Sequence, residues 1–141
     1  MDFKESASFL LAKVATAHKN LLERSMDSVG LHGGQVFVLF ALWEQDGPRQ
    51  IDLAEALNVA PPTVNKTLTG MVDSGLVTRS RYDDDARSTR IFLTDAGRAI
   101  KGEVEQKWLE VEEHISLDLT ETERLILPQL LVKLLGNYLN K

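Results

Sequence analysis

Hydrophobic side chains recur along residues 3–26 at alternating spacings of four and three residues, which places them on one side of an α-helix. This stripe consists of Phe3, Ala7, Leu10, Val14, Ala17 and Leu21. A second stripe beside it consists of Leu11, Ala15, His18 and Leu22. The pattern predicts a long helix with two faces to bury. One face suits the protein's own core, whereas the other suits either a partner chain or neighbouring helices of the same chain.

The next segment, residues 31–47, reads LHGGQVFVLFALWEQDG and is apolar almost all round. A fully buried strand would account for VFVLF, but residues 41–44 continue on a helical period. We therefore predict a buried central helix that is terminated by Gly47 and Pro48.

Two short amphipathic segments follow, with a turn between them. The first has its apolar face at Ile51, Leu53, Ala54 and Leu57. The second has its apolar face at Val64, Leu68, Met71 and Val72. Asn58 suits a left-handed turn position, and Pro61 and Pro62 suit a helix start, where their missing N–H groups are no loss. Two helices joined this closely predict a helix-turn-helix.

Beyond the second helix, Gly75 provides a stop signal, and VTRSRY and STRIFL each alternate residue by residue. These two runs predict short strands joined by the acidic segment RYDDDAR, residues 81–87. Aspartate is favoured in such turns because its side chain bonds nearby backbone N–H groups. We expect Asp83 and Asp84 to be solvent-facing turn residues.

The C-terminal part predicts two further helices. Thr94 suits the N-cap of the first, and Thr120 with Glu123 forms a capping box for the second. The stripe of the first consists of Ile100, Val104, Trp108, Val111 and Ile115. The second is rich in leucine, and Pro128 inside it removes one helical hydrogen bond and predicts a kink.

Composition bounds the class of protein. The chain has 141 residues, 43% of them hydrophobic and none of them cysteine, which excludes disulfides and thiolate metal sites. The N-terminus lacks the features of a signal peptide, and no apolar run approaches the roughly 20 residues that span a bilayer. We therefore expect a cytoplasmic protein with no membrane contact.

The net charge of −5 opposes binding to a polyanion, but the acidic residues are segregated. Residues 49–101 carry eight Lys or Arg and seven Asp or Glu, whereas the rest of the chain carries eight against fourteen. The solvent face of the second helix has no carboxylate before Asp73. It presents Pro62, Thr63, Asn65, Lys66 and Thr69. An ordinary solvated face has similar residues, but threonine can bond phosphates or bases, asparagine can pair with adenine, and lysine suits guanine or phosphate.

A helix-turn-helix followed by a hairpin is a winged helix, and residues 31–97 resemble the MarR family of bacterial winged-helix transcription regulators. The matching segments are IDLAEALNV, PPTVNKTLTGMVDSGLV, the Asp85-Ala86-Arg87 sequence and the Leu93-Thr94-Asp95-Ala96-Gly97 sequence. The resemblance implies a mainly α-helical fold with a small β-hairpin wing. A winged helix-turn-helix at 31–97 would be flanked by long dimerisation helices within 1–28 and 98–141.

The resemblance also implies how DNA is bound. Arg87 would enter the minor groove at the wing tip, Asp85 would orient its guanidinium, and we count Arg90 among the expected DNA contacts. The second helix of the pair would lie in the major groove of double-stranded DNA. A twofold homodimer would then recognise a palindromic site with half-sites about 34 Å apart. We expect the dimer contacts to include Leu10, Val14, Leu21, Leu130, Leu134 and Tyr138.

Relatives in this family often bind small aromatic or lipophilic effectors, and repression is their commoner mode of action. Candidate lining residues for an effector site are His18, Phe40 and Trp43, although core packing is the better account of the two aromatics. No cofactor is expected.

Three other classes of function fit the sequence less well. A metal-responsive regulator is disfavoured because His18, His32 and His114 lack the spacing of a ligand set. An enzyme is disfavoured because the sequence contains neither G-x-S-x-G nor a phosphate-binding glycine loop. A winged helix used for protein contacts is the main alternative, since the chain is acidic overall.

These assignments predict different roles for the residues of the acidic turn. Arg87→Ala should weaken specific DNA binding by about 1 to 3 kcal/mol without unfolding the protein, whereas Asp83→Ala should change it little. Fluorescence anisotropy with labelled operator DNA measures both losses. Equal losses would refute the assignment.

Overall fold

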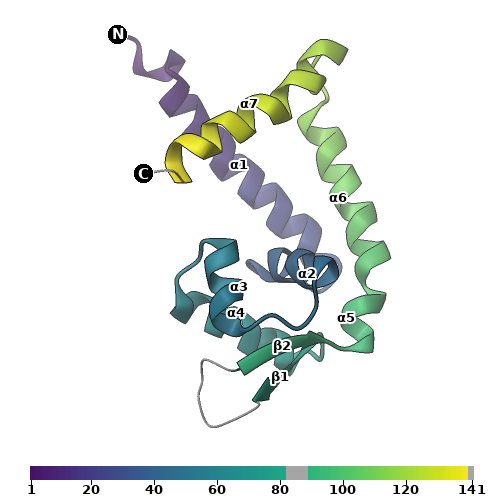
Figure 1. Cartoon of the computed structure of the whole chain (residues 1–141). Helices are drawn as coiled ribbons and strands as arrows, with labels where there is room; N and C mark the ends of the chain where they lie inside the picture. Colours follow the sequence, from purple (N-terminus) through teal and green to yellow (C-terminus); the bar gives the residue numbers. More distant parts are fainter. Residues whose placement is uncertain (82–88, 140–141) are drawn as a thin grey trace. The chain divides into compact units, whose positions relative to one another are not determined.

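A computed structural model of the chain describes residues 1–81 and 89–139 and is mainly helical, with one two-stranded antiparallel sheet (Figure 1). The expected fold class is confirmed. The elements are η1 (Phe3–Glu5), α1 (Ala7–Asp27), α2 (Gln35–Glu44), α3 (Gln50–Leu57), α4 (Pro61–Asp73), β1 (Val77–Arg81), β2 (Thr89–Leu93), α5 (Asp95–Ala99), α6 (Lys101–Ile115) and α7 (Glu121–Leu139). The chain divides into two compact units, Met1–Lys107 and Trp108–Lys141, and the boundary between them falls within α6.

The helix-turn-helix forms as predicted from its turn residues. Asn58 ends α3 in the left-handed conformation, with φ 53° and ψ 44°, and its N–H bonds the carbonyl oxygens of Ala54 and Glu55. Asparagine tolerates this conformation better than other residues with a side chain. Pro61 then begins α4, and Gly75, at φ 79°, follows the end of that helix.

The core of the first unit lies between α2, α3, α4 and the sheet. Its fully buried side chains include Leu39, Leu42, Leu53, Val64, Leu68, Met71 and Ile91. Two residues expected on buried faces are exposed instead: Ile51 by 49% and Val72 by 37%. Both lie off the centre of their helix's buried side. Val72, for instance, follows Met71 and is turned about 100° away from it.

The wing is an antiparallel pair in which Val77 lies opposite Leu93 and Arg81 opposite Thr89. Along β2, Thr89, Ile91 and Leu93 are buried, which confirms the alternation read from the sequence. The predicted turn, with Asp83, Asp84, Asp85 and Arg87, lies outside the described residues.

A junction around Gly97 connects the wing to the helices on either side. A Cβ atom at Gly97 would overlap the carbonyl oxygen of Leu76, so only glycine allows this approach. Thr94 caps α5 as predicted: its hydroxyl accepts from Gly97 N at 3.1 Å and donates to Gly75 O at 2.5 Å. Trp43 Nε1 donates to Gly97 O at 2.9 Å and so attaches α2 to the same turn.

The helix expected after Thr94 is divided at Ile100, where ψ is −11°, into the short α5 and the longer α6. The capping box of α7 is present as predicted. Thr120 N donates to Glu123 Oε1 at 2.9 Å, and Glu123 N donates to Thr120 Oγ1 at 3.2 Å. The hydrogen bond from the Thr120 backbone lowers the pKa of Glu123 below its usual value.

Among the described residues, large exposed apolar side chains are most numerous on two helices, one in each unit. They are Phe9, Leu10, Leu11 and Val14 on α1, and Leu125, Ile126, Leu130, Leu131, Val132, Leu134, Leu135, Tyr138 and Leu139 on α7. Pro128 lies inside α7. Within the described part of the chain, no helix combines the length and hydropathy that crossing a membrane requires.

The Gly97 junction predicts a sharp contrast between two glycine-to-alanine substitutions. Gly97→Ala should lower the free energy of unfolding by about 2 kcal/mol, because the new methyl group forces Leu76 and α5 apart. Gly102→Ala, in α6, meets no atom within 4 Å and should be neutral or stabilise by about 0.5 to 1 kcal/mol. Urea unfolding followed by circular dichroism measures both, and a Gly97→Ala protein as stable as the parent would contradict the role of this contact.

Candidate nucleic-acid interface

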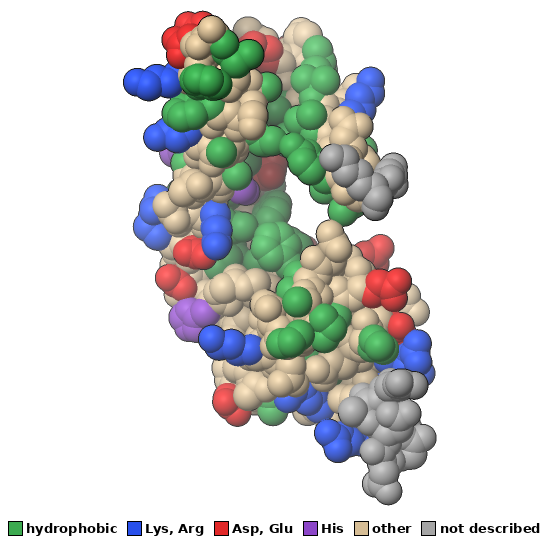
Figure 2. Space-filling model, turned by 90° about the vertical axis from the view of Figure 1, so that its left-hand side faces the viewer, with side chains coloured by type: hydrophobic (Ala, Val, Ile, Leu, Met, Phe, Trp, Pro, Cys, Tyr) green, Lys and Arg blue, Asp and Glu red, His purple; other side chains and the backbone are tan. Residues whose placement is uncertain are grey.

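One face of α4 is exposed and free of carboxylates until Asp73, while Val64 and Leu68 on the opposite face are buried. The exposed residues are those predicted: Pro62, Thr63, Asn65, Lys66 and Thr69. Figure 2 shows several Lys and Arg side chains near the segment drawn in grey, and others spread over the rest of this face. The helical period thus places these polar groups together where a large ligand has access.

The N-terminus of α4 offers no backbone donor to such a ligand. Pro61 and Pro62 have no N–H group, and the N–H groups of Thr63 and Val64 both donate to Ala60 O, at 3.0 and 3.1 Å. Ala60 supplies no side-chain cap. A phosphate at this end would therefore be bound by side chains.

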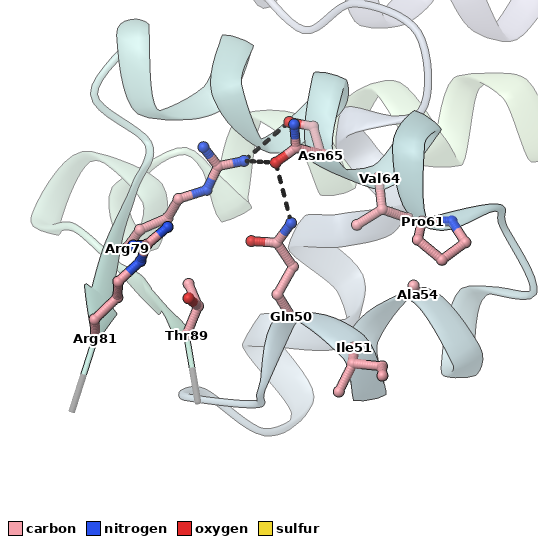
Figure 3. A pocket seen from close by; sticks show the side chains of 9 residues that line it. All are labelled: Gln50, Ile51, Ala54, Pro61, Val64, Asn65, Arg79, Arg81 and Thr89. Atoms are coloured by element: carbon pink, nitrogen blue, oxygen red, sulfur yellow. Dashed lines mark hydrogen bonds between the residues drawn. The ribbon is translucent and has the colours of Figure 1, made fainter. Parts of the chain in front are cut away.

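An arginine that the sequence analysis overlooked reaches this face from the wing. Arg79 of β1 donates from Nη2 to the backbone O of Asn65 at 2.9 Å and to its Oδ1 at 3.1 Å, and from Nη1 to Thr69 Oγ1 at 3.2 Å. Gln50, the first residue of α3, donates from Nε2 to the same Asn65 Oδ1 at 3.2 Å (Figure 3). The wing and both helices of the helix-turn-helix thus meet at Asn65.

The alternation of side chains along β1 indicates that Arg79 faces inward. Val77 and Arg79 are two residues apart and lie on the same side of the strand, and Val77 is buried. A basic residue at an inward position requires hydrogen-bond acceptors nearby. Nε of Arg79 is itself buried and has no hydrogen-bond partner among the described residues.

A cavity of about 290 Å³ lies beside this network. It is lined by Gln50, Ile51, Ala54, Pro61, Val64, Asn65, Arg79, Arg81 and Thr89. Its lining combines apolar side chains from α3 and α4 with the two arginines of β1 (Figure 3).

Near the interface, some cationic side chains are paired with carboxylates and others are not. Arg49 and Asp52 form an exposed ion pair at 2.8 Å, and the hydrogen bond from Arg49 lowers the pKa of Asp52. In the described residues, Lys66, Arg79 and Arg81 form no ion pair with a carboxylate. Among the described residues, no carboxylate thus neutralises their positive charge.

The predicted wing residues are only partly described. Arg90 is half-buried, and its Nη1 donates to Gly47 O at 2.9 Å, so it supports the loop before α3. Asp85 and Arg87 lie outside the described residues.

The three candidate effector residues are brought together only in part. The rings of Phe40 and Trp43 contact each other, with their centroids 5.9 Å apart. His18 lines a cavity of about 460 Å³ between α1 and the start of α2, and neither aromatic residue is among the residues that line it. Phe37, 42% exposed, lines it instead. Because α2 is apolar on all sides, its sequence gave no indication of which aromatic side chain faces outward. Across residues 1–81 and 89–139, no three His, Asp or Glu side chains are grouped so that they could hold a metal ion.

Comparison with known proteins agrees with this architecture. Residues 32–89 match the model of the MarR family. The HTH-type transcriptional regulator TtmR of Methylorubrum extorquens (strain PA1) is 37% identical over 71 residues, which is 50% of this chain and 36% of that protein. The organic hydroperoxide resistance transcriptional regulator of Bacillus subtilis (strain 168) is 28% identical over 101 residues, covering 72% of this chain and 69% of that protein.

Solved structures match over nearly the whole chain. A MarR transcriptional regulator from Methanosarcina mazei Go1 superposes with a TM-score of 0.82 at 24% identity, covering 93% of this chain and 94% of that one. Bordetella bronchiseptica BpsR, described as regulated in its DNA binding by 6-hydroxynicotinic acid, gives 0.83 at 24% identity and covers 95% and 96%. Residues 32–89, which include the winged helix-turn-helix, thus match the MarR family, whose members are DNA-binding transcriptional regulators and not enzymes.

Proposed function

We propose that this chain is a homodimeric, cytoplasmic transcriptional regulator that binds palindromic duplex DNA with α4 in the major groove and the wing in an adjacent minor groove. The observation that carries the proposal is the exposed face of α4, which carries Lys66 and no carboxylate before Asp73 and lies next to Arg79 and Arg81, in a protein of net charge −5. A local positive surface on an acidic protein favours a polyanionic partner at that site.

Individual roles follow from the chemistry of each side chain. Lys66 and Thr63 suit phosphates or base edges, and Pro62 contributes surface at the start of the helix. Thr69 already donates to Asn65 O at 2.9 Å and accepts from Arg79, so its hydroxyl is less available to DNA. At the wing we propose Arg87 as the minor-groove residue, oriented by Asp85, with Arg90 supporting the loop before α3.

The exposed apolar faces support the dimer. Leu10 and Val14 on α1 are exposed, as are Leu130, Leu134 and Tyr138 on α7, while Leu21 is half-buried. Monomeric soluble proteins rarely expose so many large apolar side chains in a row. We therefore assign the segments 1–28 and 98–141 to dimerisation and 31–97 to DNA binding.

An effector would act at the cavity lined by His18 and Phe37. Its volume of about 460 Å³ suits a small aromatic or lipophilic compound. BpsR, with the same fold, is described as regulated by 6-hydroxynicotinic acid. We propose repression relieved by such a compound, which requires a coupling of about 1 to 3 kcal/mol between the effector site and the DNA site.

DNA binding is tested by fluorescence anisotropy with the duplex just upstream of the gene, at two salt concentrations and against a scrambled duplex. Saturable, sequence-selective binding that weakens steeply with salt is expected, because bound phosphates release their counterions. Lys66→Ala should reduce the salt slope by about 1, whereas Lys4→Ala, outside the interface, should leave it unchanged. Absence of binding at low salt would refute the proposal and favour a winged helix that binds protein.

The dimer is tested by removing residues 1–22. The shortened protein should sediment as a monomer or aggregate, because the apolar face of α1 is lost and that of α7 remains exposed. Analytical ultracentrifugation of the full-length and shortened proteins measures this. A shortened protein that sediments as a uniform dimer would contradict the assignment.

A further inference from the structure

We infer that Asn65 reads DNA only as a hydrogen-bond donor, because Arg79 and Gln50 occupy its side-chain oxygen. The inference rests on the proposed function and specifies the chemistry of its central contact. It makes Arg79 a positioning residue that sets base preference from the wing.

The orientation of the Asn65 amide follows from the chemistry of its neighbours. Arg79 carries N–H donors and no acceptor, so the Asn65 atom 3.1 Å from its Nη2 must be the oxygen. Gln50 lies 3.2 Å from that same oxygen and must therefore present its NH₂ group. Turning either amide over would place donor against donor or oxygen against oxygen.

These two bonds use the full acceptor capacity of the oxygen. An amide oxygen has two lone pairs, and Arg79 and Gln50 take one each. The NH₂ group of Asn65 donates to no described residue, and the residue is exposed. What Asn65 offers to a ligand is a pair of N–H donors.

Arg79 is held firmly in this arrangement. Its strand pairs with β2 along its length, Arg79 lies opposite the buried Ile91, and its guanidinium bonds Asn65 twice and Thr69 once. If Asn65 turned its oxygen toward DNA, the partly buried guanidinium would lose an acceptor while its Nε is already unpaired. Charged groups in such surroundings require their hydrogen bonds.

A donor-only asparagine changes the base that is preferred. The asparagine–adenine pair needs the amide oxygen to accept from N6 of adenine while the NH₂ group donates to N7. With the oxygen occupied, the N6 amino group of adenine meets only donors. Guanine instead presents two acceptors, O6 and N7, in the major groove. We therefore assign guanine, and not adenine, to the position read by Asn65.

The test selects duplexes from a library with 20 randomised base pairs, using the full-length protein and its Asn65→Ala, Arg79→Met and Arg81→Met variants. The Asn65→Ala variant identifies the position at which preference depends on Asn65. Arg81→Met removes the same charge from the same strand, but Arg81 is not among the described hydrogen-bond partners of the Asn65 side chain, so this variant controls for charge alone. Thermal melting checks that each variant is folded.

The parent protein should prefer guanine at the identified position by about tenfold over adenine. Arg79→Met should shift that single position toward adenine, while Arg81→Met should weaken all duplexes alike and leave the preferred base unchanged. A merely structural role for Arg79 would not change one base preference selectively.

The inference is overturned if the parent protein selects adenine there, if Arg79→Met and Arg81→Met select the same base, or if Asn65→Ala alters no position. Failure of the proposed function looks different, because the parent protein would then enrich no sequence at any position. That result would overturn both.

Discussion

The backbone of Gly97 and the carbonyl oxygen of Leu76 approach so closely that no side chain fits between them, and the placement of the wing follows from this contact. Leu76 directly precedes β1, and Thr94, which caps the turn containing Gly97, directly follows β2. Both strands are thus anchored at their base, and Trp43 connects the anchor to α2. Because β1 is fixed there, Arg79 two residues along it is delivered to α4.

Much of the fold was predictable because it depends on local rules. The left-handed Asn58, the proline start of α4, the Thr94 cap and the Thr120–Glu123 capping box each involve residues within a few positions of one another. The exposure of Ile51 and Val72 was not predictable from the helical period alone. A residue at the edge of an apolar stripe is buried only if a neighbouring element covers it, and the sequence does not specify that neighbour.

The candidate site was also predictable from the sequence only in part. The period placed the polar face of α4 correctly, but the hydrogen bonds from Arg79 to Asn65 join residues 14 positions apart on different elements. The inward position of Arg79 on its strand was the only sign of these hydrogen bonds in the sequence. On the apolar α2, no periodicity distinguished Phe37, which lines a cavity, from Trp43, whose indole N–H donates a hydrogen bond to Gly97 O. The sequence pattern therefore predicts neither contacts between residues far apart in the chain nor the orientation of side chains on a helix that is apolar on all sides.

The occupied oxygen of Asn65 has a consequence for how operators are compared between relatives. Two proteins with identical recognition helices would read different bases if one carried arginine and the other an aliphatic residue at the strand position of Arg79. Binding sites could then diverge during evolution through a change in the wing, with the groove-facing helix conserved. A recognition code assembled from that helix alone would assign the same operator to both proteins.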